Sequence, residues 1–247
     1  MRRVLPWLLC WPLLVAGASR DFDGTNDQMA FTAVNPNTDG YVSAMWIKTT
    51  GTSDTLWSED CLETSTADQA CLQVDSGGNL DHSFRTDGTT GVCTNSGNTT
   101  AVNDGAWHHV AAARRDDGTD ECFIVVDGSE VERDARGGAS TGAATDSASY
   151  GQDDVGGGDY AGSMAHAIYS EIGGSTSSAA QINEVSLNPQ AFLMFPGTGG
   201  RTSWAMGGVG GEINLGPSAG AITATLTGTT EDETDGPPVM LVYGGGG

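Results

Sequence analysis

Apolar and polar positions alternate along most of the chain in short runs, and turn residues separate one run from the next. A period of two places successive side chains on opposite faces of a strand, so these runs predict β-strands. The intervening Ser76–Asn79 and Asp117–Asp120 contain the Gly, Asp and Asn residues of hairpin loops. The predicted strands are Gln28–Ala33, Tyr41–Thr49, Thr55–Glu59, Ala70–Asp75, Leu80–Arg85, Trp107–Arg114, Glu121–Asp127 and Met164–Ile172.

One later stretch has a helical pattern instead. In Ser175–Val185 apolar residues recur at spacings of three, behind Ser and Thr residues that can cap a helix. Gly, Thr and Pro dominate from there on, with Ala221–Thr227 as one further strand-like segment. The sequence therefore predicts an all-β domain over residues 19–186 that ends in a short helix. An irregular Gly-rich appendage follows over residues 187–247.

Residues 1–18 have the three regions of a secretory signal peptide. Two arginines precede an apolar run from Val4 to Val15, and the small residues Ala16–Ala18 end the segment. The run is shorter than the roughly 20 residues that cross a bilayer. We therefore expect cleavage after Ala18 rather than a retained anchor, and no membrane insertion afterwards. The mature chain is expected to be secreted or displayed on a cell surface.

Four cysteines follow this segment: Cys61, Cys71, Cys93 and Cys122. An even number of cysteines in an exported chain predicts disulfides. Three connectivities are open, and we favour Cys61 with Cys71, which flank a polar stretch between two strands, and Cys93 with Cys122. A zinc site is the competing interpretation, but the sequence has no CxxC pair.

The charge balance excludes several classes of function. The chain of 247 residues has ten Lys plus Arg against 32 Asp plus Glu, a formal charge of −22. Nucleic-acid binding is disfavoured, because that affinity comes from Lys and Arg that displace counterions from phosphates. Lys48 is the only lysine, so the Gly-Lys-Ser/Thr step of a phosphate-binding loop is absent.

Three segments carry a family resemblance. They read DFDGTND at Asp21–Asp27, DGAWHHV at Asp104–Val110 with FIVVDG at Phe123–Gly128, and DYAGSM at Asp159–Met164 with Ala167–Tyr169 after it. In this order and separation they resemble the laminin G-like, or concanavalin A-like lectin/glucanase, superfamily. The resemblance implies a jelly-roll β-sandwich of two antiparallel sheets, and it implies binding rather than turnover.

Some members of this superfamily hydrolyse glycans with carboxylates that alternate on one strand. The nearest arrangement here is Glu130, Glu132 and Asp134, which share one face if residues 129–135 are extended. A retaining hydrolase needs two carboxyl groups about 5 to 5.5 Å apart. No aromatic residue flanks the trio, so we favour a solvated acidic strand and assign no catalytic residue. A glycan hydrolase or lyase stays as an alternative.

Histidines and aromatic residues offer few binding groups. The adjacent His108 and His109 point to opposite faces of a strand, so they cannot jointly bind one metal ion, and we expect them to pack and form hydrogen bonds. Because Trp46 and Trp107 lie in apolar strand patterns, we expect both in the core. Trp57 and Tyr160 are then the predicted exposed rings for binding a sugar.

Calcium is the inorganic partner that the resemblance implies. Calcium-binding laminin G-like domains use an Asp just before one strand and an acidic or amide residue shortly before a Tyr-Gly step. These positions correspond here to Asp68 and Asp146, and a Gly-rich loop adds Asp153, Asp154 and Asp159. Calcium prefers clustered oxygen ligands. Two interpretations stay open, a calcium site or a solvated acidic surface, and no other cofactor is expected.

Together these features predict an exported, non-catalytic recognition module. Its loops at the sandwich rim would bind a glycan or a surface protein. The alternative is a structural component of a virion or cell surface. Association into homo-oligomers stays open.

Overall fold

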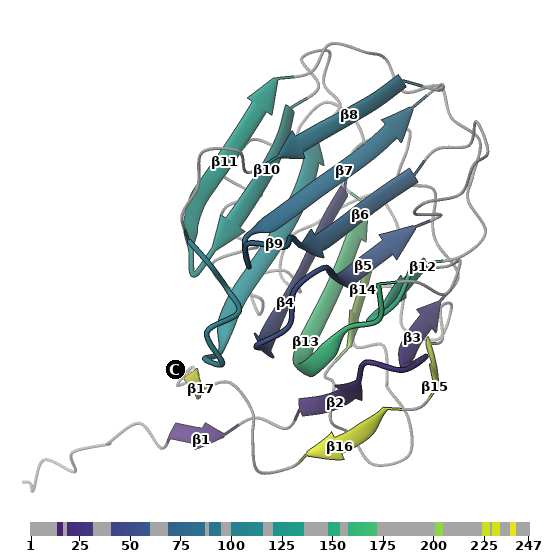
Figure 1. Ribbon diagram of the computed structural model, residues 1–247, viewed down its shortest axis with the longest axis vertical. Coiled ribbons are helices and arrows are strands. Elements are labelled where there is room, and N and C mark those ends of the chain that lie inside the picture. The colour runs from purple at the N-terminus through teal and green to yellow at the C-terminus, as the bar shows by residue number, and fades with distance from the viewer. Residues whose placement is uncertain are drawn as a thin grey trace, which may run out of the picture.

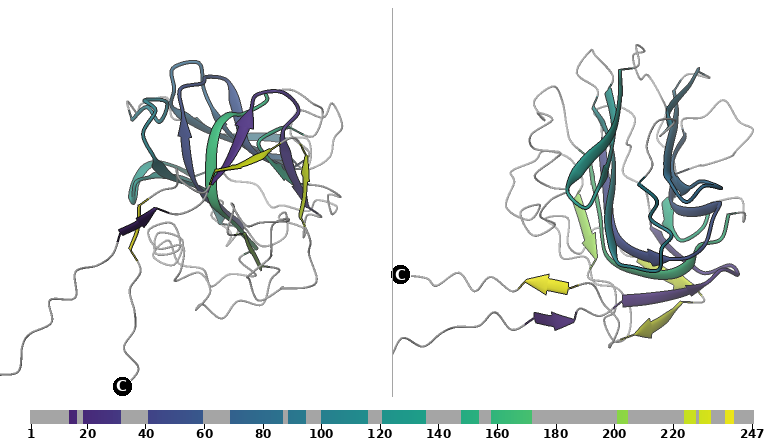
Figure 2. Two further views of the ribbon diagram at one scale, coloured as in Figure 1. Left: turned by 90° about the horizontal axis from the view of Figure 1, so that it is seen from below. Right: turned by 60° about the vertical axis from the view of Figure 1, so that its left-hand side comes forward.

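The protein folds into two stacked antiparallel β-sheets (Figures 1 and 2). The computed structural model describes residues 14–16, 19–31, 41–59, 69–86, 89–94, 100–115, 121–135, 148–153, 158–171, 201–204, 224–227, 229–232 and 238–240. The predicted all-β sandwich is confirmed. The predicted helix Ser175–Val185 lies outside these residues. In the described part of the chain, no helix is long and apolar enough to span a membrane.

The larger sheet has eight strands, in the order β11-β10-β9-β4-β13-β2-β16, with β14 also paired to β13. Their bounds are β2 Ser19–Asp23, β4 Tyr41–Thr49, β9 His108–Arg115, β10 Glu121–Val126, β11 Ser129–Ala135, β13 Ala161–Glu171, β14 Arg201–Trp204 and β16 Thr230–Asp232. The central position of β4 places it between the strands that carry two of the family-like segments.

The second sheet has seven strands, in the order β15-β3-β12-β5-β6-β7-β8. Their bounds are β3 Gln28–Phe31, β5 Asp54–Glu59, β6 Gln69–Val74, β7 Leu80–Thr86, β8 Thr89–Thr94, β12 Ala148–Tyr150 and β15 Ala224–Thr227. Two further strands, β1 (Leu14–Ala16) and β17 (Pro238–Met240), pair only with each other among the described strands.

Alternation along the strands builds the core between the sheets. Along β4, Tyr41, Met45 and Ile47 point inward and have no exposed surface. Trp57 of β5 lies 5.3 Å from Tyr41 and 5.8 Å from Tyr169 of β13, measured between ring centroids. Burying a large apolar side chain contributes roughly 1.5–3 kcal/mol. These rings therefore hold the two sheets together at the centre of the sandwich.

A β-bulge in β13 lies between the segments that pair with two different strands on the same side. Its first half pairs with β2 and its second half with β14. Between Ala165 and Ile168 the register against β4 shifts, and His166 there has a φ of 49°. An extra residue bends a strand and increases its twist. The bulge thus lies where β13 exchanges one neighbour for the other.

Strands from the predicted appendage extend both sheets. β14 pairs with β13 and β16 with β2, whereas β15 pairs with β3 in the second sheet. The described parts of residues 201–232 therefore belong to the sandwich in space. The boundary at residue 186 and the extent of the signal peptide stay predictions.

Candidate functional site

At one end of the sandwich, tight turns with acidic side chains join the strands. Asp127 and Gly128 connect β10 to β11 with φ angles of 48° and 76°. Positive φ at both central residues is typical of a type I′ turn, for which Asp-Gly is favoured. A second turn starts at Asp104, whose Oδ1 accepts a hydrogen bond from the backbone N–H of Ala106 at 2.8 Å. Both turns lie beside the first residue of β9.

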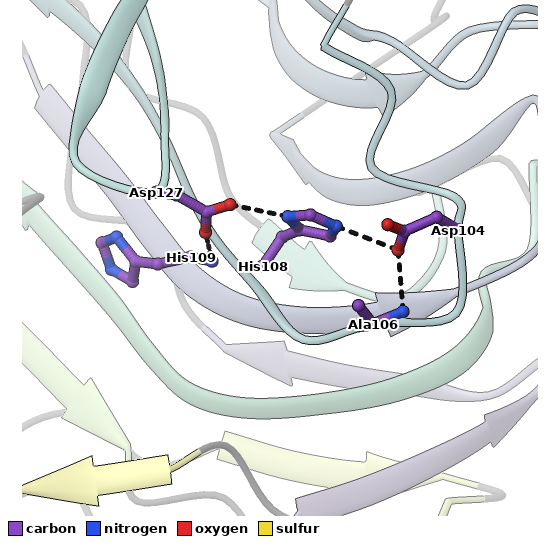
Figure 3. A network of polar contacts seen from close by, with 5 residues as sticks. All are labelled: Asp104, Ala106, His108, His109 and Asp127. Carbon is purple, nitrogen blue, oxygen red and sulfur yellow. Dashed lines mark hydrogen bonds and ion pairs between the residues drawn. The ribbon is translucent and has the colours of Figure 1, made fainter.

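His108 joins these two turns (Figure 3). Its Nδ1 lies 2.7 Å from Oδ2 of Asp127, and its Nε2 lies 3.0 Å from Oδ1 of Asp104. Ionised carboxylates only accept hydrogen bonds, so both ring nitrogens donate and the ring is an imidazolium. The other oxygen of Asp127 accepts from the backbone N–H of His109 at 2.8 Å. We call Asp104, His108 and Asp127 the rim network.

Charge and burial differ across the rim network. Burial lowers the pKa of His108, but its hydrogen bonds to Asp127 and Asp104 outweigh this effect, so the pKa lies above its usual value. The pKa of Asp104 is lowered, first by the N–H of Ala106 and then by His108. The His108 side chain is 13% exposed, whereas Asp104 and Asp127 are 58% and 49% exposed. The network thus presents fixed carboxylate acceptors to solvent.

The prediction for the two histidines is confirmed. Figure 3 shows the rings of His108 and His109 pointing away from each other across β9. His108 forms the hydrogen bonds of the rim network, and the His109 ring packs against Trp46 with centroids 5.2 Å apart. The two imidazoles therefore lie on opposite faces of the sheet.

The predicted exposure of Trp57 and Tyr160 is wrong. Both side chains are 0% exposed. Every residue of β5 is buried, and Tyr160 packs edge-on against Phe22 while its hydroxyl donates to the carbonyl of Ser163 at 2.8 Å. Neither ring offers the open face that a sugar needs. Trp46 and Trp107, both expected in the core, are instead partly exposed. Alternation in β4 turns Trp46 to the outer face of the sheet, and Trp107 lies just before the start of β9.

The three carboxylates of β11 do not all share one face as predicted, because Glu130 lies on the opposite face from Glu132 and Asp134. The register between β10 and β11 shifts, so that Glu132 lies opposite Ile124 and Glu130 lies opposite Val125. Opposite residues share a face, and Ile124 belongs to the core. Glu130 instead forms a two-pronged ion pair with Arg133, with Nε–Oε1 and Nη2–Oε2 distances of 2.7 and 2.6 Å. The β-bulge thus separates the two glutamates.

The predicted calcium ligands Asp68 and Asp146 lie outside the described residues. In the Gly-rich loop Asp153 is buried, and Asp159 accepts a hydrogen bond from Nε2 of Gln152 at 2.6 Å. Among the residues that the structure describes, no group of three or more His, Cys, Asp or Glu could hold a metal ion. Calcium binding stays a prediction.

Three of the four predicted disulfide cysteines, Cys71, Cys93 and Cys122, lie in the described strands. Cys71 of β6 and Cys122 of β10 are each disulfide-bonded. The side chains of Cys61 and Cys93 are not among those that the structure describes. The favoured pairing therefore stays a prediction.

Asp104 and Asp127 lie in the family-like segments, but the sequence alone did not mark either residue as part of a site. Each begins an Asp-Gly turn, and the β9–β10 register places Val126 opposite Val110, next to the histidines. The signal was the pairing of two Asp-Gly turns that flank neighbouring strands.

Comparison with known proteins agrees with this fold. A family model described as Concanavalin A-like lectin/glucanases superfamily matches residues 23–171. No curated protein matches the chain by sequence. A Bacteroides ovatus ATCC 8483 protein, described as a candidate carbohydrate-binding protein, is similar at a TM-score of 0.59 and 15% identity, over 93% of this chain and 63% of that protein.

Domains LG4-5 of the mouse laminin alpha1 chain are similar at a TM-score of 0.50 and 17% identity, over 69% of this chain and 46% of that one. The chain thus spans less than two thirds of either structure. At these identities the likeness shows a shared fold.

Proposed function

The chain belongs to the concanavalin A-like lectin/glucanases superfamily, and from this premise we propose that it is an exported, non-catalytic module that binds glycans at its rim. The similar Bacteroides ovatus protein, which is described as a candidate carbohydrate-binding protein, supports a glycan as the class of ligand. A filled core also favours the outer surface, since the rings of Trp57 and Tyr160 are fully buried.

The rim network is the observation that carries this proposal. Sugar hydroxyls donate hydrogen bonds well to carboxylates, and Asp104 and Asp127 hold exposed oxygens in place before any ligand arrives. Groups fixed in advance lose less conformational entropy on binding than mobile ones. His108, two turns and the start of β9 therefore act as one preorganised acceptor surface.

The β11 bulge supports a non-catalytic role. Glycoside hydrolysis requires two carboxyl groups that flank one bond. Glu130 is paired with Arg133 and lies on the opposite face from Glu132 and Asp134, so the predicted trio on one face is broken. We expect Glu132→Gln to leave glycan binding unchanged.

Export is supported by the disulfide bonds of Cys71 and Cys122, because oxidising compartments favour such bonds. Cleavage after Ala18 would leave Ser19, the first residue of β2, as the mature N-terminus. The sandwich would then keep all of its strands. Calcium held by Asp68 and Asp146 is part of the proposal, as an assisting ion.

The test is a glycan array probed with the mature chain, once with calcium and once with EDTA. We expect retained glycans, a loss of about tenfold in affinity for Asp127→Asn, and weaker binding in EDTA. Asp75→Asn is the matched control, since Asp75 also caps a turn, accepting from Gly77 and Asn79 N–H groups at 2.7 and 2.9 Å. Absence of any glycan binding would reject the proposal and favour the structural alternative.

A further inference from the structure

The surface formed by the rim network continues onto the outer face of the eight-stranded sheet. We propose that Trp46 on this face is the stacking platform for an uncharged pyranose ring, with His109 and His166 as its hydrogen-bonding partners. The inference rests on the proposed glycan-binding function and adds a subsite and a sugar class. The two surfaces meet at Asp127, whose carboxylate holds both His108 and the backbone of His109 (Figure 3).

Three neighbouring strands bring this outer-face site together. Trp46 of β4 lies opposite His109 of β9 on one side and opposite Ala165 of β13 on the other. His166 follows Ala165 in the β13 bulge, so the indole lies between the strands that carry the two imidazoles. Trp46 and His166 are partly exposed, while His109 is 4% exposed. A partly open indole with a polar group on each side suits a sugar ring.

Each imidazole has one nitrogen without a hydrogen-bond partner among the described residues. Nε2 of His109 and Nε2 of His166 are buried and find no hydrogen-bond partner in the described part of the chain. Buried polar atoms are nearly always paired, and an unpaired one destabilises the fold. Two such atoms beside one partly exposed indole indicate that a bound molecule supplies the missing partners.

The backbone of His166 supports a functional reason for this residue. Its φ of 49° lies in the left-handed region, which glycine adopts without steric penalty. A bulky residue there stores strain, and such residues cluster at functional sites. Glycine would adopt this backbone without strain, so a functional role for the imidazole would account for the strained residue.

The charge state of the pair selects an uncharged sugar. Burial lowers the pKa of His109 to about 4 and also lowers that of His166, so both rings are neutral near neutral pH. A neutral imidazole has one donor and one acceptor, as a sugar hydroxyl has. The two imidazoles bring no positive charge to hold a carboxylate or sulfate. Lys48 is the one cation of β4 on this face, and the formal charge of −22 repels anionic groups from the molecule as a whole.

The experiment measures the affinity of the mature chain for neutral gluco-, galacto- and manno-oligosaccharides, with sialylated and sulfated oligosaccharides for comparison. Trp46→Ala and His109→Phe should each lose about tenfold in affinity for the neutral ligands. His166→Gly should lose affinity without a lower melting temperature, because it relieves the strain. Arg133→Ala is the matched control, since Arg133 stacks on Phe123 of the neighbouring β10.

Lys48 gives a second readout. It is the only lysine and follows Trp46 by two residues on the same strand, so a bound neutral sugar should slow its reaction with an amine reagent in the wild type but not in Trp46→Ala. Wild-type affinity in the three site variants would reject the outer-face site and leave the glycan function standing. Binding confined to sialylated or sulfated ligands would reject the sugar class. No binding of any glycan would reject the proposed function itself.

Discussion

At the scale of single residues, His82 is a buried imidazole whose hydrogen bonds fix its tautomer. Its Nδ1 lies 2.8 Å from the carbonyl oxygen of Cys71, and its Nε2 lies 2.9 Å from the hydroxyl of Tyr41. A carbonyl only accepts, so Nδ1 carries the proton and Nε2 accepts from Tyr41. Burial lowers the pKa of His82 to about 4. A second proton would therefore break the bond to Tyr41.

This residue predicts a loss of stability in mild acid. An unfolded histidine binds its proton near pH 6.5, but folded His82 does so only near 4. Its stabilising contribution is thus complete above about pH 6.5 and is lost as the pH falls through this window. Between these pH values the His82→Gln variant should lose less stability than the wild type, by up to about 3 kcal/mol in the free energy of unfolding. Urea denaturation at several pH values measures this difference.

His108 should contribute to stability with the opposite pH dependence, so its variant serves as the control. Its raised pKa means that its contribution is present below the unfolded value and is lost as the pH rises through the folded value. His108→Gln should therefore change stability most in acid, in the direction opposite to His82→Gln. Equal pH slopes for the wild type and His82→Gln would contradict the assignment.

At the scale of elements, the turn after β12 depends on a glycine. Gly151 has a φ of 89°, and a Cβ there would collide with the Phe22 ring and approach the carbonyl oxygen of Asp27 at 3.1 Å. Both the left-handed backbone and the crowded space oppose a side chain. We predict that Gly151→Ala lowers the free energy of unfolding by about 2–4 kcal/mol, measured by chemical denaturation.

Gly77→Ala is the matched control for this turn. Gly77 also lies in a hairpin loop, but a Cβ there would meet only the side chains of Asn79 and Asp75, at 3.1 and 3.2 Å. Side-chain ends move at little cost, so its loss should stay below about 1 kcal/mol. Similar losses in the two variants would show that neither φ nor Phe22 sets the requirement for glycine.

Strands were predictable from the sequence because their pattern is local, whereas bulges were not. β4 has the bounds that alternation predicted, Tyr41–Thr49. In β11 and β13 one extra residue shifts the pairing without any compositional sign, since only the partner strand shows which residue is extra. The faces of Glu130 and Glu132 were therefore predicted wrongly, and the strained His166 could not be foreseen.

At the scale of the whole molecule, exposure depends on which strands stack, and that information is non-local. Several of the residues near Trp57 in the sequence are polar, but its side chain lies at the centre of the second sheet, against Tyr41 of the first. The rim network likewise joins Asp104 to Asp127 only because β9 and β10 form a hairpin. A sequence pattern gives the faces of one strand, but it does not say what covers each face.

The net charge of the molecule predicts that salt stabilises it. The chain carries a formal charge of −22, and Asp27 and Asp81 show the effect locally, since burial and then neighbouring carboxylates raise the pKa of each. Raising ionic strength from about 0.01 M to about 0.15 M shortens the Debye length from about 30 Å to about 8 Å. This screening weakens repulsion most in the compact folded state, where the charges lie closest together.

We therefore expect the melting temperature to rise with sodium chloride at neutral pH, in EDTA so that no divalent cation contributes. The same titration at about pH 4 is the internal control, because carboxylates with an ordinary pKa near 4 are then about half protonated and repel one another less. A smaller salt effect at the lower pH would assign the stabilisation to screened carboxylates. An equal effect at both pH values would instead point to salt acting on apolar burial, which does not depend on charge.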